Sequence, residues 1–320
     1  MVGLNAIREA RSRLAGHITR TRLEASAGFS RMSGHSVYLK PENLQKTGAF
    51  KIRGATNHIL QIDPALGRRG VIAASSGNHG QAVAHAAARA GYPAVVVVPE
   101  GASAVKVAAA RGYGAEVIYH GTTSAERAAL AGELARERGL TFIHPFDDPW
   151  VIAGQGTVGL EILEDLPEVD LVLAPVGGGG LIAGIAVAIK ESRPGTLVYG
   201  VEPVGGNSMQ RSLQAGAIAT IEQPRSVADG LLPTRPGEIT FELARKYVDG
   251  VLTVTDAEIV AAVVTLLERA RLVVEPSGAA TVAALLSGKV PGSGRRLVAV
   301  LSGGNVDLGL LADIIRGRDA

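Results

Sequence analysis

The chain has 320 residues, of which 47% are hydrophobic and 19% charged. This composition supports a well-buried core and excludes a disordered chain. The formal net charge is only +2 with acids and bases interspersed, so the clustered basic face of a nucleic-acid-binding protein is not expected. The chain has no cysteine, which excludes disulfides and thiolate metal sites and fits a reducing cytoplasm.

The first 26 residues predict an amphipathic helix that carries charges throughout. They lack the unbroken apolar stretch of a signal peptide. No window of the sequence approaches the ~20 apolar residues of a membrane span. We therefore expect a cytoplasmic protein without a membrane partner.

Short β-rich runs then alternate with alanine-rich helical stretches. The first series of runs lies at 71–74, 94–98, 116–119 and 141–143. The run "AVVVV" (94–98) does not alternate polar with apolar residues, so it predicts a strand covered on both faces. Such strands are typical of a parallel sheet flanked by helices.

A second series of β-rich runs follows at 171–176, 196–202, 250–255 and 296–302, and the early run 36–40 is expected to join its sheet. The predicted fold class is α/β, with two open parallel-sheet lobes flanked by helices. We expect a large domain of residues 1–69 and 148–320 and a small inserted α/β domain of residues 70–147. Residues 218–238 predict a long loop, and long loops in compact domains tend to be functional.

Glycine-rich segments follow several of these strands. Gly177, Gly178, Gly179 and Gly180 stand between a predicted strand and an apolar helix. A glycine loop at a helix N-terminus surrounds an anion with backbone N–H groups, and the helix dipole assists. A tight turn would need fewer glycines, because each one has an entropic cost. We therefore favour a phosphate site here.

The segment "ASSGNHGQA" (74–82) also follows a strand and opens a helix. Helix capping needs one polar residue, whereas Ser76, Gly77, Asn78 and His79 offer four kinds of donor in one turn. Such a turn is suited to holding a carboxylate. His79 alone would more often be structural than a base.

Two further segments have the same form. "VLSGGNVDLG" (300–309) places Ser302 at the end of a strand, and "VVEPSGAA" (273–280) places Glu275 and Ser277 before a helix. By itself the Ser302 segment is better explained by a turn, and Ser277 is as consistent with a helix cap as with a ligand. Because ligands of open α/β sheets bind at the carboxyl ends of strands, all the glycine-rich segments are expected to meet in one crevice.

Lys51 lies in "KTGAFKIRG" (46–54), between Phe50 and Ile52. Most lysines are solvated surface residues, but this one has apolar neighbours on both sides. A desolvated lysine loses part of its preference for the charged form and becomes an amine nucleophile that forms a Schiff base. A reactive lysine, a phosphate site and a carboxylate loop together suggest pyridoxal phosphate acting on an amino acid.

The motifs "KTGAFKIRGA", "SSGNHGQA", "PVGGGGL" and "LSGGNVD" occur in the order and at about the spacing of the threonine dehydratase and serine racemase family. The chain resembles these fold-type II pyridoxal-phosphate enzymes over nearly its whole length. The resemblance implies roles for the cofactor-binding residues: Lys51 holds the cofactor covalently, Phe50 packs on its ring, Asn78 bonds its phenolic oxygen, Gly177 to Gly180 bind its phosphate and Ser302 meets its pyridine nitrogen. It also implies that Ser76, Gly77, Asn78 and His79 bind the substrate carboxylate, with Ser76 and Lys51 as the catalytic residues.

By the same resemblance, the activity is that of an ammonia-lyase that eliminates the β-hydroxyl of threonine, serine or 3-hydroxyaspartate to give a 2-oxo acid and ammonia. Ser76 stands where racemase-like members have a serine, which suggests racemase side activity. The chain ends soon after "LSGGNVD", as in short forms without a regulatory domain, and the family suggests a homodimer. A role in hydroxyectoine or ectoine breakdown stays open as an alternative.

Two features depart from the family pattern. Ala49 replaces the more usual serine before Phe50. Glu202 stands where racemase-like members bind a divalent cation, but Ser208 occupies the position of their second acid. Since hard cations prefer carboxylate oxygens, we expect no metal site.

Two hypotheses of another class remain. Gly178, Gly180 and Ala183, followed by Glu202, fit a dinucleotide-binding fingerprint and would make the protein a nicotinamide-dependent oxidoreductase. A non-catalytic amino-acid sensor on the same scaffold is the other. The oxidoreductase hypothesis gives "KTGAFKIRG" no role, and the sensor hypothesis gives Lys51 no chemical role.

Overall fold

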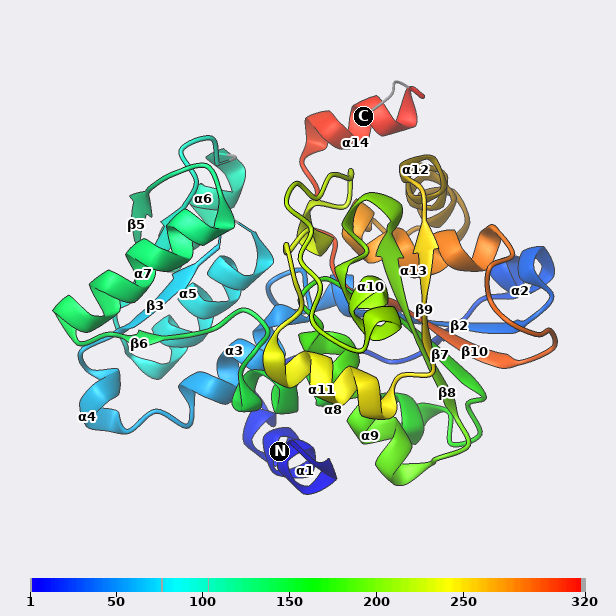
Figure 1. Ribbon diagram of the computed structural model, residues 1–320, viewed down its shortest axis with the longest axis horizontal. Helices are drawn as coiled ribbons and strands as arrows, with labels where there is room; N and C mark the ends of the chain where they lie inside the picture. Colours follow the sequence, from blue (N-terminus) through cyan, green and yellow to red (C-terminus); the bar gives the residue numbers. More distant parts are fainter. Residues whose placement is uncertain (1, 76, 103, 318–320) are drawn as a thin grey trace.

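The computed structural model describes residues 2–75, 77–102 and 104–317. Two β-sheets lie side by side, each with helices packed on its faces (Figure 1). The predicted α/β fold class with two sheets is confirmed. Within the described residues, no helix is long and apolar enough to cross a membrane.

The larger sheet has six strands in the order β1-β2-β10-β7-β8-β9. The strands are β1 (Glu24–Ala25), β2 (Ser36–Pro41), β7 (Leu171–Pro175), β8 (Leu197–Pro203), β9 (Gly250–Val254) and β10 (Arg296–Leu301). Leu297 of β10 pairs in parallel with Val37 and with Leu171, so the predicted run 36–40 does join this sheet. The short edge strand β1 pairs antiparallel to β2, which departs from the all-parallel expectation.

The smaller sheet has four parallel strands in the order β5-β4-β3-β6. They are β3 (Val71–Ala74), β4 (Ala94–Val98), β5 (Glu116–Tyr119) and β6 (Thr141–Phe142). All five residues of β4 are buried, as their unbroken apolar sequence predicts. The smaller sheet is therefore formed entirely from the first predicted series of strands.

Helices cover both sheets (Figure 1). Their bounds are α1 (Leu4–Leu14), α2 (Ala27–Ser33), α3 (Lys51–Ile59), α4 (Pro64–Gly67), α5 (Asn78–Ala90), α6 (Ala104–Gly112), α7 (Ser124–Arg138), α8 (Pro149–Asp165), α9 (Gly180–Ser192), α10 (Ser208–Ala215), α11 (Glu238–Tyr247), α12 (Asp256–Thr265), α13 (Pro276–Leu286) and α14 (Leu308–Ile315). A π-helical turn (Leu266–Ala270) continues α12, and short 3₁₀ turns lie at Glu42–Leu44, Val204–Gly206 and Asp229–Leu231.

The N-terminal helix is shorter than predicted. It ends at Leu14, and Gly16 adopts a left-handed backbone with φ of 77°. A glycine in this conformation is a common helix terminator. The predicted long loop 218–238 is present except for Glu238, which begins α11, and it contains the 3₁₀ turn Asp229–Leu231.

Helix α3 lies where the two sheets meet. Its residues Ile52, Ala55 and Ile59 are buried in a hydrophobic cluster with Val71 and Ala82 of the smaller sheet and its helix α5. The first residue of α3 is Lys51. The candidate nucleophile therefore lies at the boundary between the two sheets.

Candidate active site

Lys51 and the start of α3 are held by the segments that follow β10 and β6. The N–H of Phe50 donates to the carbonyl of Ser302 at 3.0 Å, which ties the start of α3 to the end of β10. The amine Nζ of Lys51 donates to the carbonyl oxygen of Pro145 at 2.7 Å and lies 5.2 Å from the centre of the Phe50 ring. Burial lowers the pKa of Lys51 to about 8. A sizeable fraction of this amine is therefore neutral, and nucleophilic, at mildly alkaline pH.

Loops that are far apart in sequence meet beside Lys51. Ala49 forms an isolated β-bridge with Gly303. The side-chain amide of Asn305 donates to Asn78 Oδ1 and to the carbonyl of Thr47, both at 2.8 Å. Asn78 Nδ2 in turn donates to Glu275 Oε1 at 2.7 Å. The predicted convergence of the segments around Lys51, Asn78, Glu275 and Ser302 is thus present in the structure.

The glycine loop connects β7 to α9. Gly179 has φ of 97°, and a Cβ at Gly178 would overlap the ring of Phe146. Glycine is therefore required for the backbone to pass this closely under Phe146. Within the described residues, the N–H groups of Gly177, Gly178 and Gly179 donate no hydrogen bond. These donors, together with the free first turn of α9, match what a phosphate needs.

The loop before α5 is placed only in part. Ser76 lies outside the described residues. Gly77 donates its N–H to Ser75 Oγ at 3.2 Å and precedes the first residue of α5, Asn78. His79 is 3% exposed, and its Nε2 lies 2.8 Å from the carbonyl oxygen of Ile143. Burial, with a smaller effect from the charge of Lys51, lowers the pKa of His79 to about 3, so its ring is neutral.

These residues fit pyridoxal phosphate. The cofactor needs a nucleophilic lysine and a site for a dianionic phosphate. Lys51 meets the first need, and the unused N–H groups of the glycine loop meet the second. A family model described as pyridoxal-phosphate dependent enzyme matches residues 14–303.

The chain belongs to the pyridoxal-phosphate dependent enzyme family.

Relatives within this pyridoxal-phosphate family support the assignment. An L-threonine ammonia-lyase of Thermotoga maritima is 46% identical over 315 residues, which are 98% of this chain and 78% of the relative. An L-threo-3-hydroxyaspartate ammonia-lyase of Saccharomyces cerevisiae is 41% identical, with 97% of this chain and 95% of the relative covered. The structure of maize serine racemase superposes with a TM-score of 0.94 at 39% identity, covering 99% and 97% of the two chains.

Glu202 has a structural role in this pyridoxal-phosphate enzyme. Its two carboxylate oxygens accept the N–H groups of Met209 and Gln210, both at 2.9 Å, at the start of α10. The residue is fully buried, and burial raises its pKa to about 8. Because this carboxyl group is buried under α10, the ribose hydroxyls of a dinucleotide cannot reach it, so the oxidoreductase hypothesis loses its acidic residue. Across the described residues, no three His or acidic side chains gather in a way that could hold a metal ion.

Several residues of the site were not singled out from the sequence. The Pro145 carbonyl holds Lys51, Phe146 covers the glycine loop, and Asn305 joins two loops. A backbone carbonyl has no signature in a sequence. Asn305 did carry a signal, because it lies in "SGGN" directly after the strand that ends at Leu301. Ser277, which was interpreted as either a cap or a ligand, accepts the N–H of Gly230 from the long loop at 2.9 Å.

Proposed function

We propose that the protein is a pyridoxal-phosphate-dependent ammonia-lyase that removes the β-hydroxyl and the amino group of a small hydroxy amino acid. The products are a 2-oxo acid and ammonia, and the substrates are threonine, serine or 3-hydroxyaspartate. The observation that carries the proposal is the partly buried Lys51 amine, whose pKa is lowered to about 8 beside loops with unused backbone donors. The names of the relatives point to the same reaction.

When bound, pyridoxal phosphate supplies an electron sink for the pair of electrons left when the Cα proton of an amino acid departs. We propose that Nζ of Lys51 holds the cofactor covalently and, once free, takes that α-proton. A pKa near the working pH suits a group that both accepts and returns a proton. The Pro145 carbonyl, 2.7 Å away, orients the amine.

The remaining predicted residues would bind and orient. Phe50 offers an apolar ring face beside Lys51, and the N–H groups of Gly177 to Gly180 are the proposed phosphate donors. Ser302 is proposed to meet the pyridine nitrogen. A hydroxyl there stabilises a protonated ring less than a carboxylate would, which favours elimination over transamination. Asn78, Gly77 and His79 are proposed to line the substrate carboxylate, with neutral His79 fixed on the Ile143 carbonyl.

Racemisation is the proposed second activity. Ser76 would return a proton to Cα from the side opposite Lys51. The likeness to maize serine racemase supports this role. Hydroxyectoine or ectoine breakdown stays an alternative physiological setting for the same elimination chemistry.

The test is to incubate the holoenzyme with L-serine, L-threonine and the diastereomers of 3-hydroxyaspartate. Release of 2-oxo acid and ammonia would be measured, followed by chiral analysis of the remaining substrate. We expect stoichiometric 2-oxo acid and ammonia from at least one substrate. Tight ligand binding without turnover of any of them would instead favour the amino-acid sensor.

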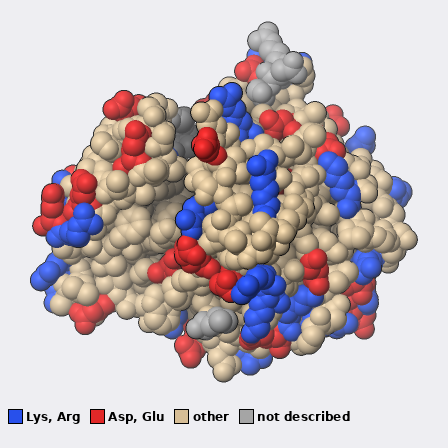
Figure 2. Space-filling model, viewed as in Figure 1, with Lys and Arg blue, Asp and Glu red and all other residues tan. Residues whose placement is uncertain are grey.

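We also propose that the enzyme works in the cytoplasm as a homodimer, with no nucleic-acid partner, and that its small domain comprises residues 70–147. The homodimer is proposed from the family resemblance. Acidic and basic side chains are mixed on the face shown in Figure 2, as expected for a protein that does not bind nucleic acid. Light scattering of the holoenzyme gives the mass that decides the oligomeric state.

A further inference from the structure

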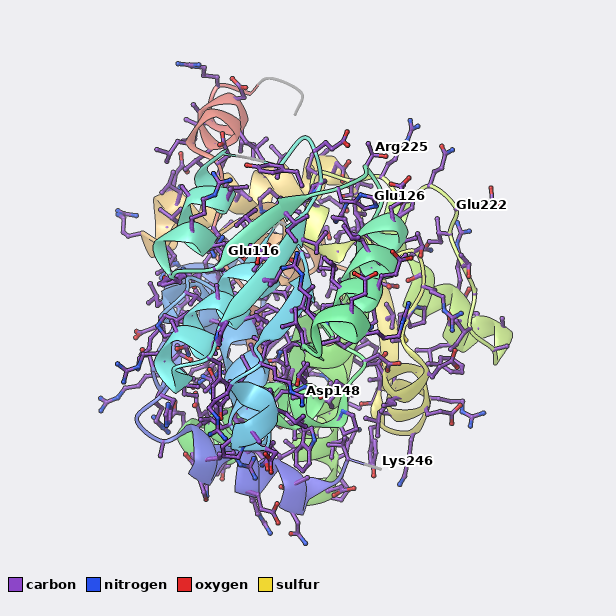
Figure 3. All side chains as sticks on the ribbon, turned by 90° about the vertical axis from the view of Figure 1, so that its left-hand side faces the viewer. Glu116, Glu126, Asp148, Glu222, Arg225 and Lys246 are labelled. Carbon is purple, nitrogen blue, oxygen red and sulfur yellow. The ribbon has the colours of Figure 1, made fainter. Side chains whose placement is uncertain are left out.

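The segment between β6 and α8 contacts the start of α11. The carboxylate of Asp147 accepts three consecutive N–H groups, from Glu238 at 3.0 Å, Ile239 at 2.9 Å and Thr240 at 3.1 Å. These N–H groups have no acceptor inside the helix, so the carboxylate caps them and complements the helix dipole. Figure 3 labels Asp148, which follows Asp147 in the chain, and Lys246, which lies near the other end of α11. In this view Lys246 is at the edge of the molecule and Asp148 is not.

Asp147 is itself held in place. Its own N–H donates to Nδ1 of His144 at 2.7 Å. A Cβ at Gly237 would overlap its carboxyl group, so Gly237 lets the start of α11 approach this closely. The position of α11 relative to the segment before α8 is therefore well defined.

Thr240 extends this connection to the glycine loop. Its side chain is fully buried, and Oγ1 donates to the carbonyl oxygen of Gly178 at 2.7 Å. The same Oγ1 accepts the N–H of Gly237 at 3.0 Å. The carbonyl of Gly237, at 3.2 Å, is the other acceptor within reach of this hydroxyl, and the shorter distance favours the Gly178 carbonyl for its one proton.

The hydrogen bond from Thr240 fixes the orientation of one peptide plane, and the Gly237 N–H makes a longer contact to the same Gly178 carbonyl at 3.4 Å. In a trans peptide the carbonyl of one residue and the N–H of the next point in opposite directions. Holding the Gly178 carbonyl on Thr240 therefore turns the Gly179 N–H away from α11. That N–H donates to no described residue. Glycine backbones rotate readily, so the peptide needs such an outside contact to stay in one orientation.

We propose that Thr240, held by Asp147 through the first turn of α11, is a positioning residue that presents the Gly179 N–H to the cofactor phosphate. The inference rests on the proposed function, because it assigns the glycine loop to pyridoxal phosphate. Thr240 touches neither the substrate nor the cofactor in this role. It acts only through the Gly178–Gly179 peptide.

The experiment compares two ligands of the apoenzyme, pyridoxal phosphate and pyridoxal, which lacks the phosphate. Dissociation constants would be measured from the absorbance change on binding. Thr240→Val removes the hydroxyl at almost constant volume, and Thr240→Ser keeps it. For Thr240→Val we expect about a tenfold weaker affinity for pyridoxal phosphate, within the range for loss of one buried hydrogen bond, and an unchanged affinity for pyridoxal. Thr240→Ser should behave as the parent.

Thr196→Val is the matched control. Thr196 is 1% exposed, and its Oγ1 donates to the carbonyl of Val169 at 2.8 Å, before β8 and away from the glycine loop. Thr196→Val should change neither the affinity for pyridoxal phosphate nor the affinity for pyridoxal. Should Thr240→Val not fold, Asp147→Asn provides the second variant, with a smaller loss for pyridoxal phosphate alone. Equal weakening for both ligands, or no change for either, would overturn the inference. If the parent itself fails to prefer pyridoxal phosphate over pyridoxal, the proposed function fails first.

Discussion

Lys51 and Arg53 lie two residues apart on α3, and their surroundings are opposite. Arg53 is fully buried, with Nε 2.7 Å from Glu42 Oε2 and Nη1 2.7 Å from Glu161 Oε1. Lys40 adds a second buried cation, 2.6 Å from Glu161. Lys51 instead has the carbonyl of Pro145 as its hydrogen-bond partner.

The two environments lead to different protonation. Burial alone would lower the pKa of Arg53, but the charges of Glu42 and Glu161 outweigh it and raise the pKa overall. At Lys51 burial acts without a neighbouring carboxylate to oppose it, and the pKa falls to about 8. Paired carboxylates keep the Arg53 guanidinium charged, whereas Lys51, without such a partner, becomes reactive.

The largest expected effect is on catalysis. Lys51→Ala should lower turnover by about a thousandfold or more, since both the covalent anchor and the general base are lost. Borohydride reduction followed by peptide mass analysis should place the cofactor on Lys51 in the parent. Lys46→Ala, at an exposed lysine in the same loop, should leave turnover unchanged. A labelled residue other than Lys51 would show that Lys51 does not hold the cofactor.

Removing Arg53 should act on folding. Arg53→Met leaves Glu42 and Glu161 buried without their main partner, and we expect the free energy of unfolding to fall by about 3–5 kcal/mol. Arg53→Lys keeps the positive charge but loses the planar guanidinium group. The free energy of unfolding should therefore fall by less than for Arg53→Met. Urea denaturation of the apoenzyme measures both. A loss below about 1 kcal/mol for Arg53→Met would mean that the cluster contributes little to stability.

The free energy of unfolding of the apoenzyme should depend on pH through Lys51. The pKa of Lys51 is about 8 in the folded protein against 10.5 for a free lysine, so between these values the unfolded chain binds more protons. The free energy of unfolding should therefore rise with pH across this window. Below this window Lys51→Met should have a higher free energy of unfolding than the parent apoenzyme. This advantage should shrink by up to about 3 kcal/mol from pH 8 to pH 10.5. A constant difference would show that Lys51 is not desolvated.

The smallest effect is expected from a neutral neighbour of Arg53. Thr157 Oγ1 accepts from Arg53 Nη1 at 3.1 Å and donates to the Gly154 carbonyl at 2.6 Å. Thr157→Val should lower the free energy of unfolding by about 1 kcal/mol, the usual value for a hydrogen bond. A loss as large as that of Arg53→Met would show that the hydroxyl, not the carboxylates, holds the guanidinium.

The sequence predicted the surroundings of Lys51 better than those of Arg53. The apolar neighbours of Lys51 and the glycines after each strand are local features, and the parallel topology brings them together. The partners of Arg53 are 11 and 108 residues away in sequence. Pairing over such distances has no local pattern, and the same holds for Asp147 and Thr240. Glu202 was correctly placed at a strand end, but only the structure shows that α10 occupies its oxygens.

The surroundings of the glycine loop between β7 and α9 predict how cofactor binding depends on salt concentration. A Cβ at Gly178 or Gly179 would first meet Phe146, Met209 and Thr240, and none of these side chains is cationic. A dianion held there would be balanced by peptide dipoles at short range rather than by mobile arginine or lysine heads. Ionic strength screens surface charges far more than buried dipoles. The protein should thus retain its cofactor over a broad span of salt concentration.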